Sequence, residues 1–255
     1  MAISNKQRLD LVEAYIREHK YADLHDLAEK FETSLSTIRR TLNDLEATGV
    51  IRRHHGGASL IENGGAGGYD FITQDDSHAE EKRRLAAAVR EQVEDGMTLF
   101  IDGGTTTYAV AKALLERRLI LITNSLPIAA LLNEVSNCET IVTGGTLYNR
   151  LGVLCGHTCE ATIEEMHADL AILGCAGITA EGVWNSNDLL AGYQRKMVQS
   201  ADSTLFVADA SKLGRRALAL SLRYQPRLRV LSTGDPSPEL HEEAAARGSS
   251  FLSCS

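Results

Sequence analysis

The chain has 255 residues, 44% of them hydrophobic, and a formal net charge of -8, which is enough chain for one large domain or for a small domain joined to a medium one. It contains no run of the roughly 18 apolar residues that a membrane span needs, and its first residues lack the apolar core of a signal peptide, so we expect a cytoplasmic protein. The five cysteines are odd in number and show no CxxC spacing, which argues against a disulfide framework.

Charge divides the chain into two parts. Residues 1–61 carry nine basic and nine acidic side chains, whereas residues 62–255 carry 17 basic and 25 acidic ones. The change falls at "ENGGAGGYD", where four glycines in five positions disfavour any stable helix or strand. We therefore predict a first domain at 1–61, a Gly-rich linker at 62–75 and a second domain at 76–255.

Three short helices are predicted in the first domain. Apolar residues three and four apart indicate a helix from about Lys6 to His19 and another within "ADLHDLAEKF". Ser34 is a suitable N-cap for a third helix with Ile38, Leu42 and Leu45 facing inward, and Gly49 is a suitable end. This outline is that of a helix-turn-helix.

The third helix and the segment after it concentrate positive charge. The residues of this helix that do not face inward are typical of contacts to base edges and phosphates. The following "VIRRHHGGASLI" alternates apolar and polar residues around a Gly-Gly turn and predicts a two-stranded wing. An isolated arginine pair is usually just solvated, but a cap, a turn and a basic wing beside it favour DNA contact. The expected DNA-binding residues are Ser34, Ser36, Thr37, Arg39, Arg40, Arg52, Arg53, His54, His55 and Gly56.

The second domain begins with the charged helix "HAEEKRRLAAAVREQVEDG", followed by "MTLFIDGGTTTYAVAKAL". A buried strand over 98–101 delivers Asp102, two glycines allow a tight turn, and three threonines open a helix. Backbone amides at a helix N-terminus together with hydroxyls form an anion cradle. The loop has neither the GK[ST] of a Walker loop nor the GxGxxG of a dinucleotide site, so neither type of nucleotide-binding site is favoured.

The strand-loop-helix pattern then repeats. Six predicted strands alternate with helices, which indicates a mostly parallel α/β sheet whose ligand binds at the carboxyl ends of the strands. A small phosphorylated ligand is the simplest occupant of the polar and glycine-rich loops there. The expected effector-binding residues are Asp102, Gly103, Gly104, Thr105, Thr106, Thr107, Asn124, Ser125, Gly144, Gly145, Gly177 and Lys212.

Two features leave alternatives open. Asp102 is a possible catalytic carboxylate, but spacing identifies no partner acid, so a ligand hydroxyl contact or a loop-structuring role is favoured. Cys155, His157 and Cys159 of "CGHTC" would lie on one face of an extended segment, with His167 as a conceivable fourth zinc ligand, although structural zinc sites use wider spacings. We expect this segment to enter a helix, and we predict no metal and no cofactor. Trp184 is a candidate for the pocket wall, the core or an interface.

The stretch "SLSTIRRTLNDLEATGVIRRHHGGA" resembles the signature of the DeoR family of bacterial transcription regulators, with its TIRRDL helix and RxHGGA wing. The resemblance continues in the second domain, where the family motifs DSGTTT, TNS, GG, GxxGI and ADxSKxG have counterparts from Asp102 to Gly214. It implies an effector domain similar to ribose-5-phosphate isomerase, with a phosphorylated sugar or polyol held by Gly104, Thr105 and Thr106 near Lys212.

The chain departs from the family pattern at two places. Thr41 stands beside Arg40 where an acidic residue is usual, so the operator sequence is not carried over. Leu190, Ala191 and Gly192 occupy a region where a Glu is common, so the carbohydrate end of the pocket is the least transferable part.

The predicted protein is a homo-oligomeric repressor of a carbohydrate-metabolism operon, dimeric or tetrameric, that binds double-stranded operator DNA and is released by its effector. One alternative is a sugar-phosphate isomerase fused to a DNA-binding module. Another is a DNA-binding scaffold whose second domain serves for oligomerisation alone.

Overall fold

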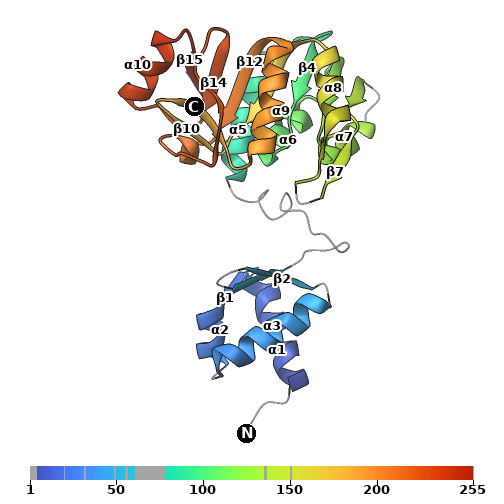
Figure 1. Ribbon diagram of the computed structural model, residues 1–255, viewed down its shortest axis with the longest axis vertical. Helices are drawn as coiled ribbons and strands as arrows, with labels where there is room; N and C mark the ends of the chain where they lie inside the picture. The colour runs from blue at the N-terminus through green and yellow to red at the C-terminus, as the bar shows by residue number, and fades with distance from the viewer. Residues whose placement is uncertain are drawn as a thin grey trace. The chain divides into compact units, whose positions relative to one another are not determined.

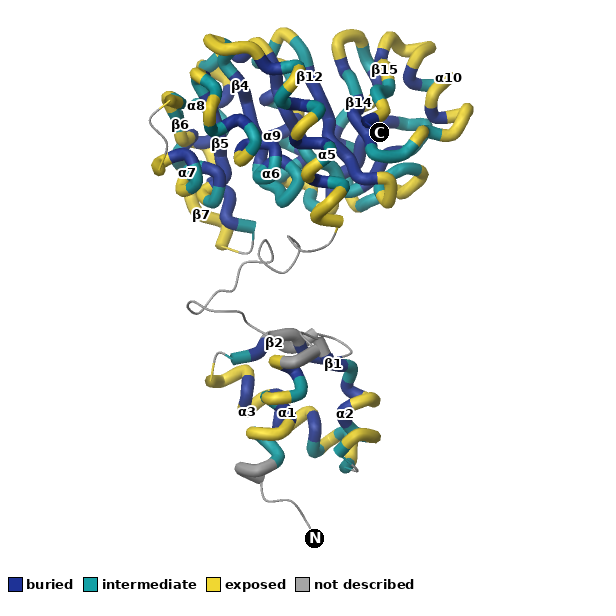
Figure 2. Tube along the Cα trace, turned by 180° about the vertical axis from the view of Figure 1, so that it is seen from behind, coloured by how far each residue is buried: buried dark blue, intermediate teal, exposed yellow. Residues whose placement is uncertain are grey.

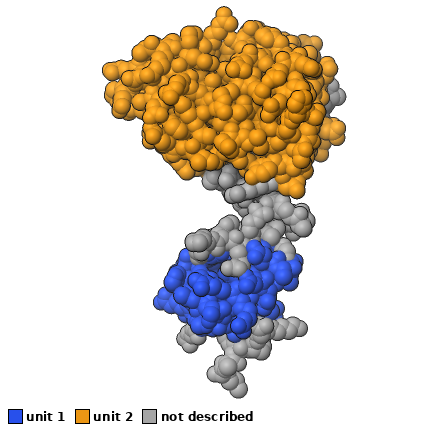
Figure 3. Space-filling view, viewed as in Figure 1, with its two compact units in different colours: residues 1–68 blue, residues 69–255 orange. Residues whose placement is uncertain are grey.

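The structure is a computed structural model that describes residues 5–19, 21–31, 33–48, 50–54, 57–60, 78–134, 137–149 and 151–254. Its contacts divide the chain into two compact units, residues 1–68 and 69–255 (Figure 3). The predicted boundary at residue 61 and the predicted linker at 62–75 lie outside the described residues and stay predictions. Among the described helices, none is both long and apolar enough to cross a membrane.

The first unit packs three helices against a small antiparallel sheet (Figure 1). The helices are α1 (Asn5–His19), α2 (Leu24–Lys30) and α3 (Leu35–Ala47); the strands are β1 (Tyr21–Asp23), β2 (Ile51–His54) and β3 (Gly57–Leu60), in the order β1-β3-β2. Ser34 caps α3 by accepting a hydrogen bond from the Thr37 amide. The inward positions predicted from the sequence, Ile38, Leu42 and Leu45, are buried.

One element of this unit was not predicted, and one predicted residue lies outside the described part of the chain. Strand β1 was not predicted, because three residues are too few to show an alternating pattern. Helix α3 ends at Ala47 with Thr48 as its C-cap, and the predicted terminator Gly49 lies outside the described residues.

Thr41 belongs to the core of the first unit. Its side chain is 1% exposed; its hydroxyl donates to the Thr37 carbonyl over 3.0 Å and accepts from the Arg8 Nε of α1 over 3.2 Å. Thr41 thus faces α1, whereas its neighbour Arg40 is exposed. This hydroxyl ties the third helix to the first.

The Thr41→Val substitution keeps the shape of the side chain and removes both hydrogen bonds. We expect the local stability of α3 to fall by about 1 kcal/mol, the net contribution of a buried hydrogen bond, measured by hydrogen exchange of the α3 amides. Thr41→Ser, which keeps the hydroxyl, is the control. If the α3 amides are equally protected from hydrogen exchange in the wild type and in Thr41→Val, the Arg8 contact contributes nothing to the stability of this helix.

The second unit is built on a seven-stranded parallel sheet in the order β15-β14-β12-β9-β4-β5-β6. Its strands are β4 (Thr98–Ile101), β5 (Leu119–Thr123), β6 (Cys138–Val142), β9 (Ala168–Gly174), β12 (Ala201–Ala208), β14 (Leu228–Ser232) and β15 (Ser250–Ser253). The mostly parallel α/β architecture predicted from the sequence is confirmed. Strand β15 was missed, because "SFLS" has no alternation that separates it from a loop.

Smaller strands lie outside this sheet. An antiparallel sheet joins β10 (Gly177–Thr179), β11 (Gly182–Asn185) and β13 (Ala219–Leu222), and β7 (Thr146–Tyr148) pairs with β8 (Val153–Cys155). The apolar segment "LAILGCAGI" therefore spans two strands, β9 and β10. The chain turns out of the main sheet between Gly174 and Gly177.

Helices cover both faces of the main sheet because its strands alternate apolar side chains toward each face (Figure 2). Leu99 and Ile101 pack with α5 (Ala79–Arg90), α6 (Thr105–Ala113) and α7 (Leu126–Asn133). Phe100 packs with α8 (His157–Glu165), α9 (Asp188–Gln199) and α10 (Pro238–Ala246). The result is a three-layer α/β/α unit.

The strand order reverses direction between β4 and β9. The chain runs from β4 outward through β5 and β6, and later from β9 outward through β12, β14 and β15. Loops leaving the carboxyl ends of β4 and β9 consequently separate onto opposite faces and leave a crevice between them.

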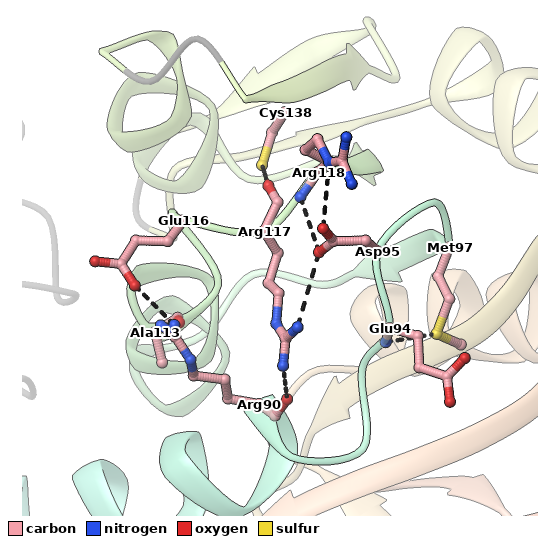
Figure 4. A network of polar contacts seen from close by, with 9 residues as sticks. All are labelled: Arg90, Glu94, Asp95, Met97, Ala113, Glu116, Arg117, Arg118 and Cys138. Carbon is pink, nitrogen blue, oxygen red and sulfur yellow. Dashed lines mark hydrogen bonds and ion pairs between the residues drawn. The ribbon is translucent and has the colours of Figure 1, made fainter.

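The opposite, amino edge of the sheet is held by a polar network (Figure 4). Arg90, the last residue of α5, donates to the Ala113 carbonyl of α6 over 2.7 Å, and Arg117 donates back to the Arg90 carbonyl over 3.3 Å. Asp95, just before β4, accepts hydrogen bonds from the backbone and guanidinium of Arg118. These contacts anchor the C-terminal end of α5. The N-terminal end of this helix lies at the opposite edge of the sheet, where the strands have their carboxyl ends.

Candidate functional site

The exposed side of α3 carries the predicted DNA-contacting residues. Arg39 and Arg40 are exposed, and in the part of the chain that the structure describes neither has an ion-pair partner. Ser34 is also exposed, but its hydroxyl lies 2.8 Å from the hydroxyls of both Ser36 and Thr37 as part of the helix cap. The two arginines therefore present unneutralised charge beside a row of hydroxyls.

The wing is present as a backbone feature. Strands β2 and β3 pair antiparallel from Ile51 opposite Leu60 to His54 opposite Gly57. The predicted contacts Arg52, Arg53 and His54 are on β2. His55 and Gly56 lie outside the described residues.

A pocket of about 480 Å³ opens where the strand order of the large sheet reverses. Its walls come from the loops after β4, β9, β11 and β12, from the start of α5 and from α9. Of the predicted effector residues, it brings together Asp102, Gly103, Gly104, Thr105, Thr106 and Lys212.

One end of this pocket is suited to an anion. Helix α6 begins after Gly104, which supplies no capping side chain, so the amides of its first turn are open to a ligand on the pocket side. Three cationic residues line the same pocket: Lys82 from α5, and Lys212 and Arg215 beyond β12. Lys82 is 5% exposed, so its side chain lies inside the protein.

Glycine is required in the loop before α6. A Cβ atom on Gly103 would lie 2.3 Å from the Val153 side chain of β8, a distance that forces a shift. The β7–β8 hairpin thus packs against this loop, and the loop keeps its path because residue 103 has no side chain.

Asp102 is the centre of a buried hydrogen-bond network. Its carboxylate accepts from the Gly174 amide of β9 over 3.0 Å and from the Gln194 side-chain nitrogen of α9 over 2.6 Å. The same Gln194 nitrogen donates to the Gly174 carbonyl, and its oxygen accepts from the Ser221 hydroxyl of β13 over 2.6 Å. Every polar atom of the Gln194 amide is used, so its orientation is determined.

Burial raises the pKa of Asp102 to about 7, although the hydrogen bonds from Gln194 and Gly174 act in the opposite direction. Asp209, which also lines the pocket, behaves differently. Burial raises its pKa, but hydrogen bonds from Ser211 and the charge of Lys212, 3.6 Å away, outweigh this and hold the pKa below its usual value. The pocket therefore holds one carboxyl that titrates near neutrality and one that stays ionised.

Comparison with known proteins agrees with this architecture. The model of the DeoR-like helix-turn-helix domain matches residues 8–63, and that of the DeoR C-terminal sensor domain matches residues 77–227. The chain belongs to the DeoR family of transcription regulators. Its resemblance to this family, predicted from the motifs, is confirmed.

The chain is similar along most of its length to curated members of the DeoR family. It is 35% identical to the glycerol-3-phosphate regulon repressor of Escherichia coli over 83% of this chain and 84% of that protein. It is 31% identical to the L-fucose operon activator of the same bacterium over 74% of this chain and 79% of that protein. Family members of this similarity thus include a repressor and an activator.

Among solved structures, ribose 5-phosphate isomerase A from Methanocaldococcus jannaschii matches 54% of this chain and 55% of its own, with 17% identity and a TM-score of 0.37. So weak a similarity implies nothing about activity.

Six residues predicted to bind the effector do not line the pocket, and each has a structural reason to be polar or glycine. Thr107 donates to the Asp102 carbonyl, Asn124 donates to the Leu154 carbonyl, and Ser125 caps α7. The glycines allow close approach of backbone segments. A Cβ on Gly145 would lie 2.4 Å from the Cys155 carbonyl oxygen, one on Gly177 would lie 2.1 Å from the Arg215 carbonyl oxygen, and Gly144 has a φ of +71°.

Several pocket residues were missed by the sequence reasoning. Some lie inside recognised motifs and could have been included: Gly174, Cys175, Ala176, Asp209 and Ser211. Others come from segments that no loop motif marks: His78, Lys82, Leu151, Asn185, Ser186, Leu190 and Arg215. Leu190 lies in the region where the DeoR family commonly has a Glu, so this departure brings an apolar side chain to the pocket wall.

The "CGHTC" segment enters a helix, as expected, and does not form the extended segment that the zinc alternative requires. Cys155 ends β8, whereas His157 begins α8 and is exposed, and Cys159 is buried within that helix. His167 lies 3.5 Å from Asp202. Trp184 does not line the pocket; it is 9% exposed and its indole nitrogen donates to Thr179. Among described residues, the ligand atoms that do gather within 4.8 Å belong to His78, Glu81 and Asp209.

The raised pKa of Asp102 has a consequence for stability. From about pH 4 to about pH 7 the unfolded chain releases this proton and the folded protein keeps it, so the free energy of unfolding falls as pH rises. We expect Asp102→Asn to remove this fall, a difference on the order of 4 kcal/mol across that range, measured by denaturant unfolding followed by the fluorescence of the single tryptophan, Trp184.

Asp209→Asn is the matched control. Because the pKa of Asp209 is lowered in the folded protein, its contribution to the free energy of unfolding is lost as pH falls. Asp209→Asn should therefore change the dependence of that free energy on pH at acidic pH and leave the fall toward pH 7 in place. An identical pH profile for wild type and Asp102→Asn would contradict the assignment.

Proposed function

We propose that this DeoR-family regulator represses a carbohydrate-metabolism operon and that a phosphorylated sugar or polyol, bound in the pocket of the second unit, lowers its affinity for operator DNA. The observation that carries the proposal is the juxtaposition, in one pocket, of the open N-terminus of α6, two lysines and an arginine with the Asp102 carboxylate. The helix N-terminus and the three cationic side chains suit a phosphate, and the carboxylate suits the hydroxyl groups of the ligand.

The pocket size supports a small ligand. A volume of about 480 Å³ lies within the usual range of roughly 300–1,000 Å³ for small-molecule sites. The similar Escherichia coli repressor is named for a glycerol-3-phosphate regulon, which makes glycerol 3-phosphate the first compound to test. The apolar Leu151 and Leu190 in the wall favour a ligand with a short hydroxylated chain over one that is polar all round.

On the DNA side, α3 would enter the major groove, with Arg39 and Arg40 on base edges or phosphates and the β2–β3 wing on the adjoining backbone. One small module seldom binds tightly enough alone, so we propose that the second units associate and place two modules on repeated half-sites. Size-exclusion chromatography with light scattering tests this, because a monomer at operator-binding concentrations would contradict it.

The decisive experiment is binding of the purified protein to DNA from its own promoter, titrated with a panel of phosphorylated sugars and polyols at fixed salt. Release by one compound supports both parts of the proposal. DNA binding that no compound alters would contradict the effector class. Turnover of ribose 5-phosphate that Asp102→Asn abolishes would instead favour an enzyme.

Lys212→Gln removes a positive charge from the pocket while leaving the first unit unchanged. We expect effector affinity to fall at least about tenfold, the effect of losing a charge-assisted phosphate contact, with operator affinity in the absence of effector unchanged. Isothermal titration measures the first and fluorescence anisotropy the second. Lys112→Gln, at the exposed far end of α6, is the control and should bind effector normally.

Arg40→Gln tests the DNA surface. If Arg40 contacts a phosphate, operator affinity falls and the slope of log affinity against log salt drops by about 1. Arg17→Gln serves as the comparison, since Arg17 is an exposed arginine of the same unit already paired with Glu13 at 2.7 Å. An unchanged salt slope for Arg40→Gln would exclude a phosphate contact by this residue.

A further inference from the structure

The start of α5 is a wall of the pocket, and along the chain it is the first described segment after β3 of the first unit. His78 is the N-cap residue of α5, and it has a left-handed backbone conformation with φ of 59°. Its carbonyl accepts the Lys82 amide over 3.0 Å, which begins the helix. His78 and Lys82 both reach the pocket, so anything bound there meets this helical turn.

A continuous series of hydrogen bonds joins this turn to the phosphate end of the pocket. The Thr233 hydroxyl accepts from the Ala210 amide over 2.9 Å and donates to the Glu81 carboxylate over 2.9 Å. The other Glu81 oxygen contacts the His78 imidazole. Ala210 begins the 3₁₀ helix η1 (Ala210–Lys212), whose Ser211 and Lys212 line the pocket.

Charge at this point is closely balanced. The ligand atoms of His78, Glu81 and Asp209 lie within 4.8 Å of one another, and the Lys212 ammonium group is 3.6 Å from the Asp209 carboxylate. The Lys212 ammonium group contacts Asp209, and the His78 imidazole contacts Glu81. We expect a phosphate that binds Lys212 to weaken its contact with Asp209 and so to alter the contacts among Asp209, His78 and Glu81 at the start of α5.

We propose that the series Ala210–Thr233–Glu81–His78 transmits occupancy of the pocket by a phosphate group to the beginning of α5, and thereby to the segment that leads to the DNA-binding unit. The inference rests on the proposed function, since it takes the effector to be a phosphate ester. The network at Arg90 holds the other end of α5 (Figure 4), so a rearrangement at the pocket is expressed at the N-terminal end of the helix.

Thr233→Val is the sharpest test, because Thr233 does not line the pocket and valine keeps its shape while breaking both bonds of the series. The matched control is Thr162→Val, which also removes a hydroxyl with two hydrogen bonds, to the Thr143 and Thr158 carbonyls. His78→Asn is the second variant, since asparagine tolerates a left-handed conformation. Arg227→Asn is its control, because Arg227 is the other non-glycine residue with positive φ among the residues that the structure describes.

The measurements are operator affinity with and without saturating glycerol 3-phosphate or inorganic phosphate, binding of the same probes by titration, and hydrogen exchange of the α5 amides. In the wild type we expect the probe to lower operator affinity by roughly 5-fold to 150-fold, the usual range of coupling between sites. It should also change exchange at the first turn of α5. In Thr233→Val the probe should still bind within about threefold of wild type, and release of DNA should fall at least about fivefold. His78 lines the pocket, so the probe affinity of His78→Asn is measured first and its DNA release is compared at a probe concentration that saturates this variant.

Each result bears on the inference. Normal release by Thr233→Val, or equal loss of release in Thr162→Val, overturns it while the proposed function stands. DNA release without any change in exchange at the start of α5 overturns it as well. If neither probe binds or alters operator affinity in the wild type, the proposed effector class and the inference fall together.

Discussion

The second unit depends on one buried carboxylate at the place where its strand order reverses. Asp102 follows β4, and its hydrogen bonds reach the end of β9 and the middle of α9, segments that are 72 and 92 residues away in the chain. These bonds join the loop after β4 to the end of β9 and to α9, at the point where the loops leave the sheet toward opposite faces. The carboxylate thus connects the pocket walls, and Gln194 and Ser221 extend this connection to β13.

In a chain of formal net charge -8, the pocket gathers the cations that suit the proposed anionic ligand. The cations of the pocket are not part of a generally basic surface; they are three residues drawn from α5 and from the segment after β12. Their carboxylate neighbours differ in protonation, because burial raises the pKa of Asp102 whereas hydrogen bonds and Lys212 lower that of Asp209. A carboxyl that is partly protonated near neutral pH repels a phosphate less than a carboxylate that stays ionised.

The sequence was sufficient for the architecture and for part of the site. Periodicity and caps located α1 to α3, and apolar runs located six of the seven parallel strands. Loops after parallel strands must meet at one edge, which is why Asp102 to Thr106 and Lys212 were found together. The same rule could not separate residues that face the pocket from those that shape the loops. Asn124 and Gly145 look like ligand residues in the sequence, and their partners, Leu154 and Cys155, are known through tertiary contacts alone.

The effect of a departure from the family pattern depends on what the side chain at that position contacts. Thr41 follows the two arginines of α3, but it is buried against Arg8, so a change there acts on the packing of the first unit and not on the groups facing DNA. Leu190 follows the N-cap Asn187 by three residues on α9 and lines the pocket, so a change there alters the pocket wall. Operator recognition is therefore better inferred from Arg39 and Arg40 than from Thr41, and effector identity is better sought beside Leu190 than beside the threonines of α6.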